Sequence, residues 1–154
     1  MTIPKTLLSI LALASLALAE GDTFATKFNA LPKSVQETAK KHMENAFPVS
    51  IAAAKGAQGW DYQINTRVDG KYHDLVIDEK GQLVAIKDET ELAALPAAAK
   101  AAIEKQTSSA KLVTLEKVTE GPRVSYGAVI RDAAQGTITQ IRVDADGTVK
   151  PKKP

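Results

Sequence analysis

In this 154-residue chain, the residues that most resemble a chemical site lie in two acidic turns, where carboxylates at regular spacing could bind a metal ion. One reads VIDEKGQL, with Asp78 three residues before Gly81, and the other reads VDADGTV, with Asp144 three residues before Gly147. A calcium loop needs oxygen ligands at alternate positions over about twelve residues and a final bidentate carboxylate. No acid follows Gly147, and Lys80 occupies a ligand position in the first turn. Because Asp at the first position and Gly at the fourth are typical of tight turns, we predict that both turns are architectural.

Other chemistry finds few residues to support it. The chain has two histidines and no cysteine, so it lacks the ligand set of a zinc site. We expect His42 on the edge of a helix and His73 on a strand opposite Thr66, both in structural roles. Serine-nucleophile, phosphate-loop and dinucleotide-binding motifs are missing. We therefore expect no catalytic residue, no metal and no cofactor, although the residues leave open a hydrolase that uses loop carboxylates.

The amino terminus has the pattern of an export signal. Lys5 precedes the apolar run LLSILALASLALA (7–19), which ends in the small-x-small pattern Ala17-Leu18-Ala19 that signal peptidase recognises. The run is too short to cross a bilayer comfortably. We expect a signal peptide at 1–19 with cleavage after Ala19, and a mature protein that is periplasmic or secreted and does not insert into a membrane.

The charge balance argues against a nucleic-acid partner. The chain holds 20 Lys and Arg against 18 Asp and Glu, and loss of the signal removes only Lys5 from these. Nucleic-acid binding needs a clustered basic face. The basic cluster here is the terminal KPKKP (150–154), and we expect 151–154 to be a disordered tail.

The sequence resembles itself at a nearly constant offset. ALPKSVQETAKKHMENAF (30–47) parallels ALPAAAKAAIEKQTSSAK (94–111), and Tyr62 lies 64 residues before Tyr126. The two acidic turns match at an offset of 66 residues. Self-similarity of this kind predicts a repeated structural unit, and we place the two repeats at 28–87 and 92–150.

Each repeat is expected to open with a helix and to continue as antiparallel strands. Apolar residues recur at helical steps through 30–47, where Pro48 should end the helix, and a second helix is expected near 96–106. The segment WDYQINTRV (60–68) alternates apolar and polar residues, and Asp69-Gly70 is a strong signal for a two-residue hairpin. The predicted fold is α+β, with two tandem helix-plus-antiparallel-β-meander repeats whose helices pack on one face of the sheet or sheets.

The opposite face of the strands is the candidate contact surface. Pairing across the Asp69-Gly70 turn would put Ile64 opposite Leu75 and Tyr62 opposite Ile77 under the helix. Alternation then turns the other side chains outward, and aromatic and arginine groups on a rigid sheet are the types that anchor protein interfaces. The residues that we predict to contact a protein partner are Arg67, Tyr72, Asp74, Val76, Arg131, Ile138 and Arg142.

The export signal, the helix opened by LP, the W-x-Y-x-I strand and the V-x-D-x-x-G turn together resemble the PepSY-like and β-lactamase-inhibitor-like tandem-repeat proteins of bacterial periplasms. The resemblance covers roughly 28–87 and 92–150. The second copy departs from it, with Val124 where the first has an aromatic residue and a longer RDAAQG hairpin.

That resemblance implies a non-enzymatic protein that binds, or binds and inhibits, a periplasmic or secreted protein such as a peptidase. It supplies no catalytic residue and no cofactor to carry over. The alternative is an envelope or stress protein that binds a small molecule or a metal ion.

Overall fold

The structure is a computed structural model that describes residues 23–56 and 59–151. The predicted signal peptide (1–19) and residues 152–154 of the predicted tail lie outside these ranges, whereas Pro151 belongs to the last strand. The helices are α1 (Phe24–Asn29), α2 (Lys33–His42) and α3 (Ala97–Gln106), with the 3-10 turn η1 (Leu92–Ala94). The strands are β1 (Phe47–Gly56), β2 (Gly59–Val68), β3 (Lys71–Asp78), β4 (Leu83–Glu89), β5 (Ala110–Glu120), β6 (Arg123–Asp132), β7 (Ile138–Asp144) and β8 (Val149–Pro151).

All eight strands form one antiparallel sheet in the order of the sequence, β1 to β8. The joint lies between β4 and β5, where Lys87 pairs with Val118 and Glu89 with Glu116. The predicted α+β fold of two tandem helix-plus-meander repeats is therefore wrong. The molecule is a strand-rich protein built on a single continuous sheet, because backbone pairing between β4 and β5 leaves no boundary between two separate sheets.

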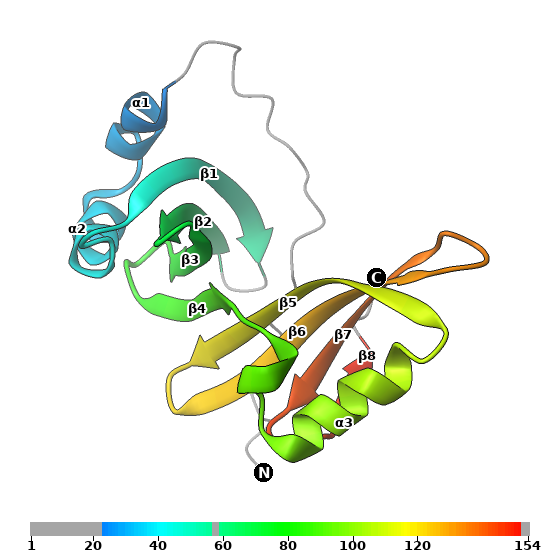
Figure 1. The fold of residues 1–154 in the computed structure, drawn as a ribbon. Coiled ribbons are helices and arrows are strands. Elements are labelled where there is room, and N and C mark those ends of the chain that lie inside the picture. Colours follow the sequence, from blue (N-terminus) through cyan, green and yellow to red (C-terminus); the bar gives the residue numbers. More distant parts are fainter. Residues whose placement is uncertain (1–22, 57–58, 152–154) are drawn as a thin grey trace.

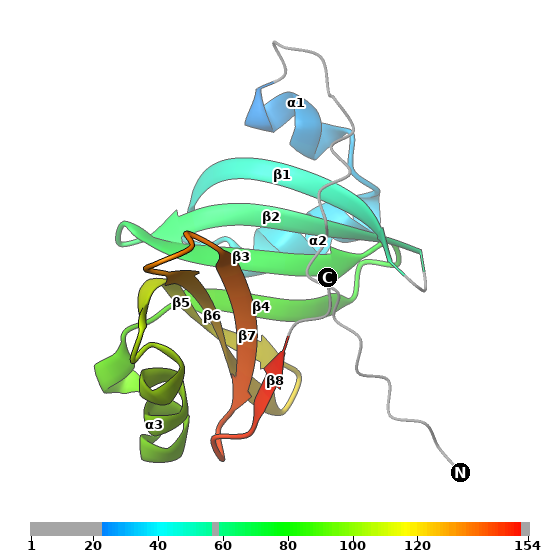
Figure 2. The ribbon, with the colours of Figure 1, turned by 90° about the vertical axis from the view of Figure 1, so that its right-hand side faces the viewer.

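The sheet bends where β4 meets β5. Figure 1 shows β1–β4 and β5–β8 meeting at a steep angle, with α2 outside the first group of strands and α3 outside the second. Figure 2 shows the same relation from the side, with β5–β8 crossing the direction of β1–β4. Both groups keep their helix on the same face of the continuous sheet, so no helix of residues 23–56 and 59–151 lies over the other face.

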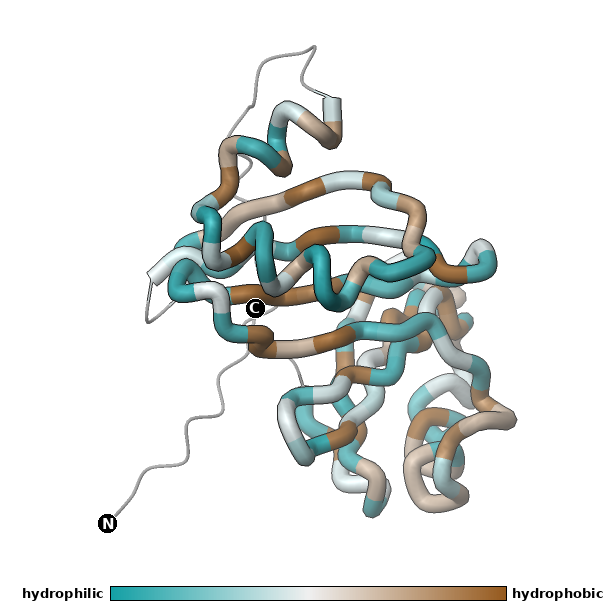
Figure 3. Tube along the Cα trace, turned by 90° about the vertical axis from the view of Figure 1, so that its left-hand side faces the viewer, coloured by the Kyte–Doolittle hydropathy of each residue, from teal (hydrophilic) through white to brown (hydrophobic). Residues whose placement is uncertain are grey.

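The β2–β3 hairpin follows its predicted register. Asp69 and Gly70 have φ values of 51° and 79°, which is the pair of positive values that a type I′ turn requires. Val68 pairs with Lys71, and Ile64 pairs with Leu75. Since paired residues share a face, this register places Ile64, Leu75 and Ile77 together under α2, and Figure 3 shows an apolar stretch in β3.

Two apolar cores lie between the helices and the sheet. The first contains five fully buried residues from α2, β2 and β3, namely Val35, Ala39, Ile64, Leu75 and Ile77. The second lies under α3 and consists of Leu95, Ala99, Ile103, Leu115, Tyr126, Ala128, Ile130, Ile141 and Val143. Burial of these side chains removes apolar surface from water and is the main stabilising contribution to each half.

The first long helix ends earlier than its apolar spacing predicts. The helix α2 ends at His42, and Phe47 is the first residue of β1 rather than the last of the helix. Asn45, with φ of 64°, makes the turn between them. The expected helix at 96–106 is confirmed by α3, whereas α1 and η1 were not predicted.

The turn glycines are held beneath the helix starts. A Cβ atom on Gly81 would lie 2.6 Å from the Cβ of Ser34, and a Cβ on Gly147 would lie 2.8 Å from the Ala98 carbonyl oxygen. Both glycines also have positive φ values, 82° and 87°. Thr38 Oγ1 adds a hydrogen bond to the Gly81 carbonyl at 2.6 Å. The two turns therefore fix the positions of α2 and α3 on the sheet.

Candidate protein-binding face

The face of the sheet opposite α2 and α3, called the uncovered face below, runs without interruption across the joint. Leu75 and Ile77 of β3 and Tyr126 of β6 contact the helices, so their neighbours along each strand point the other way. The pairs that belong to this other side include Asp74 with Lys87, Lys87 with Val118, and Val118 with Ser125. A single surface thus extends over strands from both groups.

All seven predicted contact residues lie on this face, but they divide into two environments. Arg67 and Tyr72 lie at the β2–β3 hairpin, and Arg131 and Ile138 lie at the β6–β7 hairpin. Tyr72, Ile138 and Arg131 are exposed there. The other three lie nearer the bend and are largely buried, namely Asp74, Val76 and Arg142.

The aromatic end of the face is a row across β1, β2 and β3. Phe47 lies opposite Arg67, and Arg67 lies opposite Tyr72. The Arg67 guanidinium carbon is 4.1 Å from the centre of the Tyr72 ring, which is a cation–π distance. Arg67 Nη1 also donates to the Gly70 carbonyl at 2.9 Å. Phe47 is 71% exposed and Tyr72 is 48% exposed, so two aromatic rings flank an ordered arginine.

The cationic end is the corresponding row across β5, β6 and β7. Lys111 lies opposite Arg131, and Arg131 lies opposite Ile138. Lys111 and Arg131 are both exposed, and Ile138 is 54% exposed. Two like charges directly opposite one another on one face of a sheet are destabilising. The cationic end therefore holds an unfavourable pair at the rim of the uncovered face.

Apolar residues fill the bend of the uncovered face without help from a helix. Val76, Ala85 and Val118 form a third buried cluster, with Val118 fully buried. Their burial follows from the angle between the two groups of strands, since side chains at the joint cover one another. Val76, predicted as a contact residue, is only 7% exposed, so its side chain packs within the bend.

Polar side chains of β2, β3 and β4 lie beside this apolar cluster. Gln63 Nε2 donates to Asp74 Oδ2 at 3.2 Å, and Lys87, which is 6% exposed, lies opposite Asp74 in the register. Burial raises the pKa of Asp74, while the charge of Lys87 acts to lower it. Asp74 is thus held in place by its neighbours within the fold.

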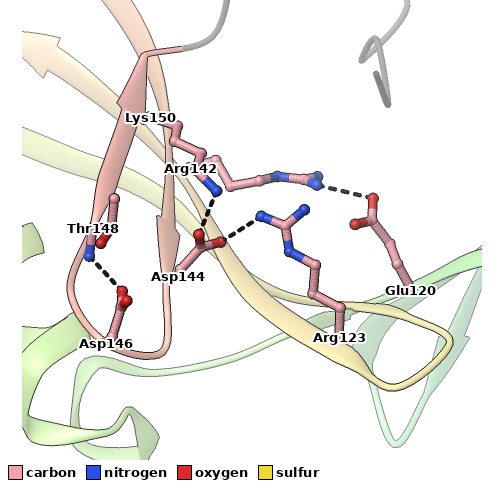
Figure 4. A network of polar contacts seen from close by, with 7 residues as sticks. All are labelled: Glu120, Arg123, Arg142, Asp144, Asp146, Thr148 and Lys150. Atoms are coloured by element: carbon pink, nitrogen blue, oxygen red, sulfur yellow. Dashed lines mark hydrogen bonds and ion pairs between the residues drawn. The ribbon is translucent and has the colours of Figure 1, made fainter. Parts of the chain in front are cut away.

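On the second side, ion pairs occupy the charged side chains, as Figure 4 shows. Arg142 Nη1 donates to Glu120 Oε1 at 3.0 Å, and both side chains are more than four-fifths buried. Arg123 Nη2 donates to Asp144 Oδ1 at 2.8 Å, and Lys150 pairs with the other oxygen of Asp144. These contacts cross β5, β6, β7 and β8, so they tie the four strands together.

The pKa of Asp144 follows from that arrangement. Desolvation acts to raise it, but the hydrogen bonds and charges of Lys150 and Arg123 outweigh desolvation and leave the pKa below its usual value. The same bond to Asp144 raises the pKa of the Arg123 guanidinium. Asp144 is therefore ionised as part of a charged network.

The two acidic turns use their carboxylates differently. Asp78 Oδ1 accepts from the backbone N–H groups of Lys80 at 2.9 Å and Gln82 at 2.8 Å, as the prediction of an architectural turn requires. In the second turn Asp146 accepts from the Thr148 N–H at 2.9 Å. Asp144 is instead directed to its ion pairs, so the parallel between Asp78 and Asp144 holds for the backbone and fails for the side chain.

Three buried polar atoms have no hydrogen-bond partner in the described part of the chain, and all belong to the uncovered face. They are Asp74 Oδ1, Ser125 Oγ and Arg142 Nη2. Ser125 is fully buried although sequence alternation turns it away from the helices. In the strand register Arg142 lies opposite Gly127, and Glu120 lies opposite Arg123. The Arg142 side chain reaches Glu120, so it passes over the position of Ser125, which lies between Arg123 and Gly127 on β6.

The two histidines have different surroundings. His73 lies opposite Thr66 on the helix side, as expected, and its Nδ1 is 2.6 Å from Asp88 Oδ1. His42 is an exposed residue in the last turn of α2. Within residues 23–56 and 59–151, no three His, Asp or Glu side chains gather where they could hold a metal ion. None of the helices in those ranges has the length and apolarity needed to span a membrane.

Sequence reasoning missed two members of the rim. Phe47 was assigned to the end of a helix, so its place in the aromatic end was lost with the helix boundary. No pattern in the sequence marked Lys111 as a contact residue, and only the register places it opposite Arg131. Both positions follow directly once the starts of β1 and β5 are known.

Comparison with solved structures gives several proteins of the same fold. A protein from Bacteroides eggerthii described as periplasmic has a TM-score of 0.66 at 18% identity, over 80% of this chain and 88% of its own. A DUF2874 family protein from Bacteroides uniformis has a TM-score of 0.62 at 18% identity, over 77% and 85%. A BLIP-like protein from Bacteroides fragilis has a TM-score of 0.57 at 16% identity, over 80% and 85%.

These identities establish a shared fold. Neither protein-family models nor curated proteins give a match to this sequence. The expected likeness to β-lactamase-inhibitor-like periplasmic proteins is thus found at the level of fold, while the PepSY part of the expectation stays a prediction.

Proposed function

We propose that this chain is an exported, non-enzymatic protein that binds a periplasmic or secreted partner protein through the uncovered face. The observation that carries the proposal is the one-sided cover of the sheet. Both helices pack on one side, while the other presents a preorganised centre between two exposed rims. A rigid surface loses little conformational entropy when a partner binds, which favours affinity.

The chemistry of the rims supports a protein partner. Aromatic residues and arginine are enriched at the centres of protein interfaces and supply most of their binding energy. The aromatic end offers Phe47 and Tyr72 around Arg67 in a fixed arrangement. The fold shared with periplasmic and BLIP-like proteins supports the same reading of location and function.

The centre of the face contributes shape and rigidity. Its charges are engaged by neighbours in the pairs Arg142–Glu120 and Arg123–Asp144, and its apolar cluster is buried at the bend. Such side chains keep their positions when a partner arrives. The exposed residues at the two ends then make the contacts that determine affinity.

Affinity capture from periplasmic extract tests this proposal. The full-length sequence is expressed with export, recovered from the periplasm and immobilised, and bound proteins are quantified by mass spectrometry. We expect one or a few proteins to be retained by the native chain and by Lys105→Ala, which changes an exposed residue of α3. Tyr72→Ala should reduce their retention. Equal retention by Tyr72→Ala would contradict a role for the uncovered face.

A further inference from the structure

The cationic end of the uncovered face contains a charge arrangement that folding alone disfavours. Lys111 and Arg131 are direct cross-strand neighbours, both exposed, and neither has an ion pair or hydrogen bond to another side chain in the ranges that the structure describes. Like charges at such positions oppose one another. The fold would be more stable with an acid at either position.

The nearest acid in sequence is already engaged. Asp132 follows Arg131, but its Oδ1 accepts from the N–H groups of Ala134 at 2.8 Å and Gln135 at 2.7 Å within the hairpin turn. Its carboxylate therefore stabilises the turn. Elsewhere on the same strands, Arg123 and Arg142 each have a carboxylate partner. On the uncovered face of β5–β8, within the residues that the structure describes, Lys111 and Arg131 are therefore the cations without a carboxylate partner.

An exposed apolar side chain completes this end. Ile138 lies directly opposite Arg131 and is 54% exposed. A carboxylate brought to the two cations would relieve their repulsion, and an apolar group beside it would cover Ile138. A small inorganic anion would relieve the repulsion but would not cover Ile138.

We propose that the cationic end, formed by Lys111, Arg131 and Ile138, binds a carboxylate-bearing segment of the partner protein that also carries an apolar side chain. This inference rests on the proposed function and names the partner's chemistry at one rim. In the β1–β4 group, Phe47, Arg67 and Tyr72 occupy the corresponding places. Because one end is cationic and the other aromatic, the partner docks in a single orientation.

Selection from a phage-displayed library of random peptides on the exported native protein tests the proposal. We expect enriched peptides that carry Asp or Glu next to apolar residues. Each is then resynthesised together with an analogue that has Asn or Gln in place of the acids. The acidic form should bind more tightly, and added salt should weaken its binding, because exposed charge pairs are screened.

The discriminating variant is Lys111→Glu. It places an acid opposite Arg131, so we expect the urea midpoint to rise while affinity for the acidic peptides falls about tenfold, in line with the loss of close charge pairs. Lys80→Glu makes the same change of charge in the exposed β3–β4 turn and should leave affinity unchanged. If Lys111→Glu gains stability and loses affinity, Lys111 acts in binding, because loss of a purely structural residue would lower stability.

Three results would overturn the inference. Enriched peptides could lack acids, or acidic peptides could bind Lys111→Glu as tightly as the native protein. Alternatively, heparin or phosphatidylglycerol vesicles could bind the native protein and lose binding to Lys111→Glu while no acidic peptide binds. That result would assign the cations to an anionic polymer or lipid surface. Peptides without acids whose binding is lost in Tyr72→Ala would leave the proposed function in place. Peptides that ignore both ends would count against both proposals.

Discussion

The guanidinium of Arg67 lies over the ring of Tyr72, 4.1 Å from its centre, on the face of the sheet opposite α2 and α3. The two residues are cross-strand partners, so backbone pairing fixes their separation. Each orders the other while leaving half of the tyrosine side chain open to solvent. This pair is an exposed aromatic feature of the uncovered face whose arginine is held by two contacts, to the Tyr72 ring and to the Gly70 carbonyl.

Replacement of Tyr72 should separate binding from stability. Tyr72→Ala removes an exposed ring, so we expect affinity for the captured partner to fall by about 2 kcal/mol, the size typical of an interface anchor. The free energy of unfolding should fall by no more than about 1 kcal/mol, the size of an exposed cross-strand or cation–π pair. Tyr72→Phe keeps the ring under Arg67 and should bind as the native protein does. Titration calorimetry and urea unfolding give the two quantities, and a large loss of stability in Tyr72→Ala would refute the assignment.

Arg142 and Arg131 should behave differently although both were predicted as contacts. Arg142→Ala leaves Glu120 without its partner in a largely buried place, so we expect a loss of roughly 1–3 kcal/mol in unfolding free energy. Arg131→Ala removes an exposed cation and should change stability by no more than about 0.5 kcal/mol. Urea denaturation at neutral pH compares them. Equal losses would show that the Arg142–Glu120 pair is not structural.

Lys87 should be required mainly when Asp74 is ionised. Lys87→Met removes the cation beside a carboxyl whose pKa burial already raises. A raised pKa in the folded state means that stability is fully present below the unfolded pKa, near 4, and declines as pH rises through the folded pKa. We expect the variant to lose roughly 1–3 kcal/mol at pH 7 and to approach the native protein near pH 4. Urea unfolding between pH 4 and pH 7 measures this difference in stability. The control is the double variant with Lys87→Met and Asp74→Asn, in which the pH dependence should be lost.

Asp144 should give the opposite pH dependence. Its folded pKa lies below the usual value because Lys150 and Arg123 outweigh desolvation. Its contribution is therefore present above the unfolded pKa and is lost as pH falls through the folded pKa. Asp144→Asn should reduce stability at pH 7 and have less effect as acid is added. A difference between variant and native protein that does not shrink in acid would contradict the charged network of Figure 4.

Substitution of the turn glycines Gly81 and Gly147 by alanine should destabilise the protein more than the same substitution at Gly70, which also has a positive φ but no close neighbour. Gly81→Ala and Gly147→Ala meet both a positive φ and a close contact with a helix start, so each should cost about 2–4 kcal/mol. Gly70→Ala has a φ of 79° and nothing within 4 Å of its Cβ, so it should cost about 1 kcal/mol. Thermal and urea unfolding compare the three. Similar losses at all three positions would show that the contacts with α2 and α3 contribute little.

Local patterns in the sequence were sufficient to predict the β2–β3 hairpin and its register. Alternation along 60–68 and the Asp69-Gly70 signal gave the correct pairing of Ile64 with Leu75, because a two-residue turn fixes register. The second helix was also placed correctly, since Pro96 marks its start and its apolar residues recur at helical steps.

Pairing between distant strands could not be predicted in the same way. Nothing local in 83–89 or 110–120 states that Lys87 lies opposite Val118, and this pairing converts two expected meanders into one sheet. The bend that follows explains why Val76 and Ser125 are buried on a face that alternation turns outward. Of the predicted contact residues, the four at the hairpins are exposed or rim residues, while the three near the bend are largely occupied within the fold.

Photo-crosslinking in living cells tests most directly whether the uncovered face binds the partner. A benzoylphenylalanine residue is introduced at position 72, position 138, or position 41 on α2, and adducts are identified after irradiation. We predict that one partner protein is crosslinked from positions 72 and 138 and that position 41 gives no adduct with it. Crosslinking of that protein from position 41 but from neither rim position would contradict binding through the uncovered face.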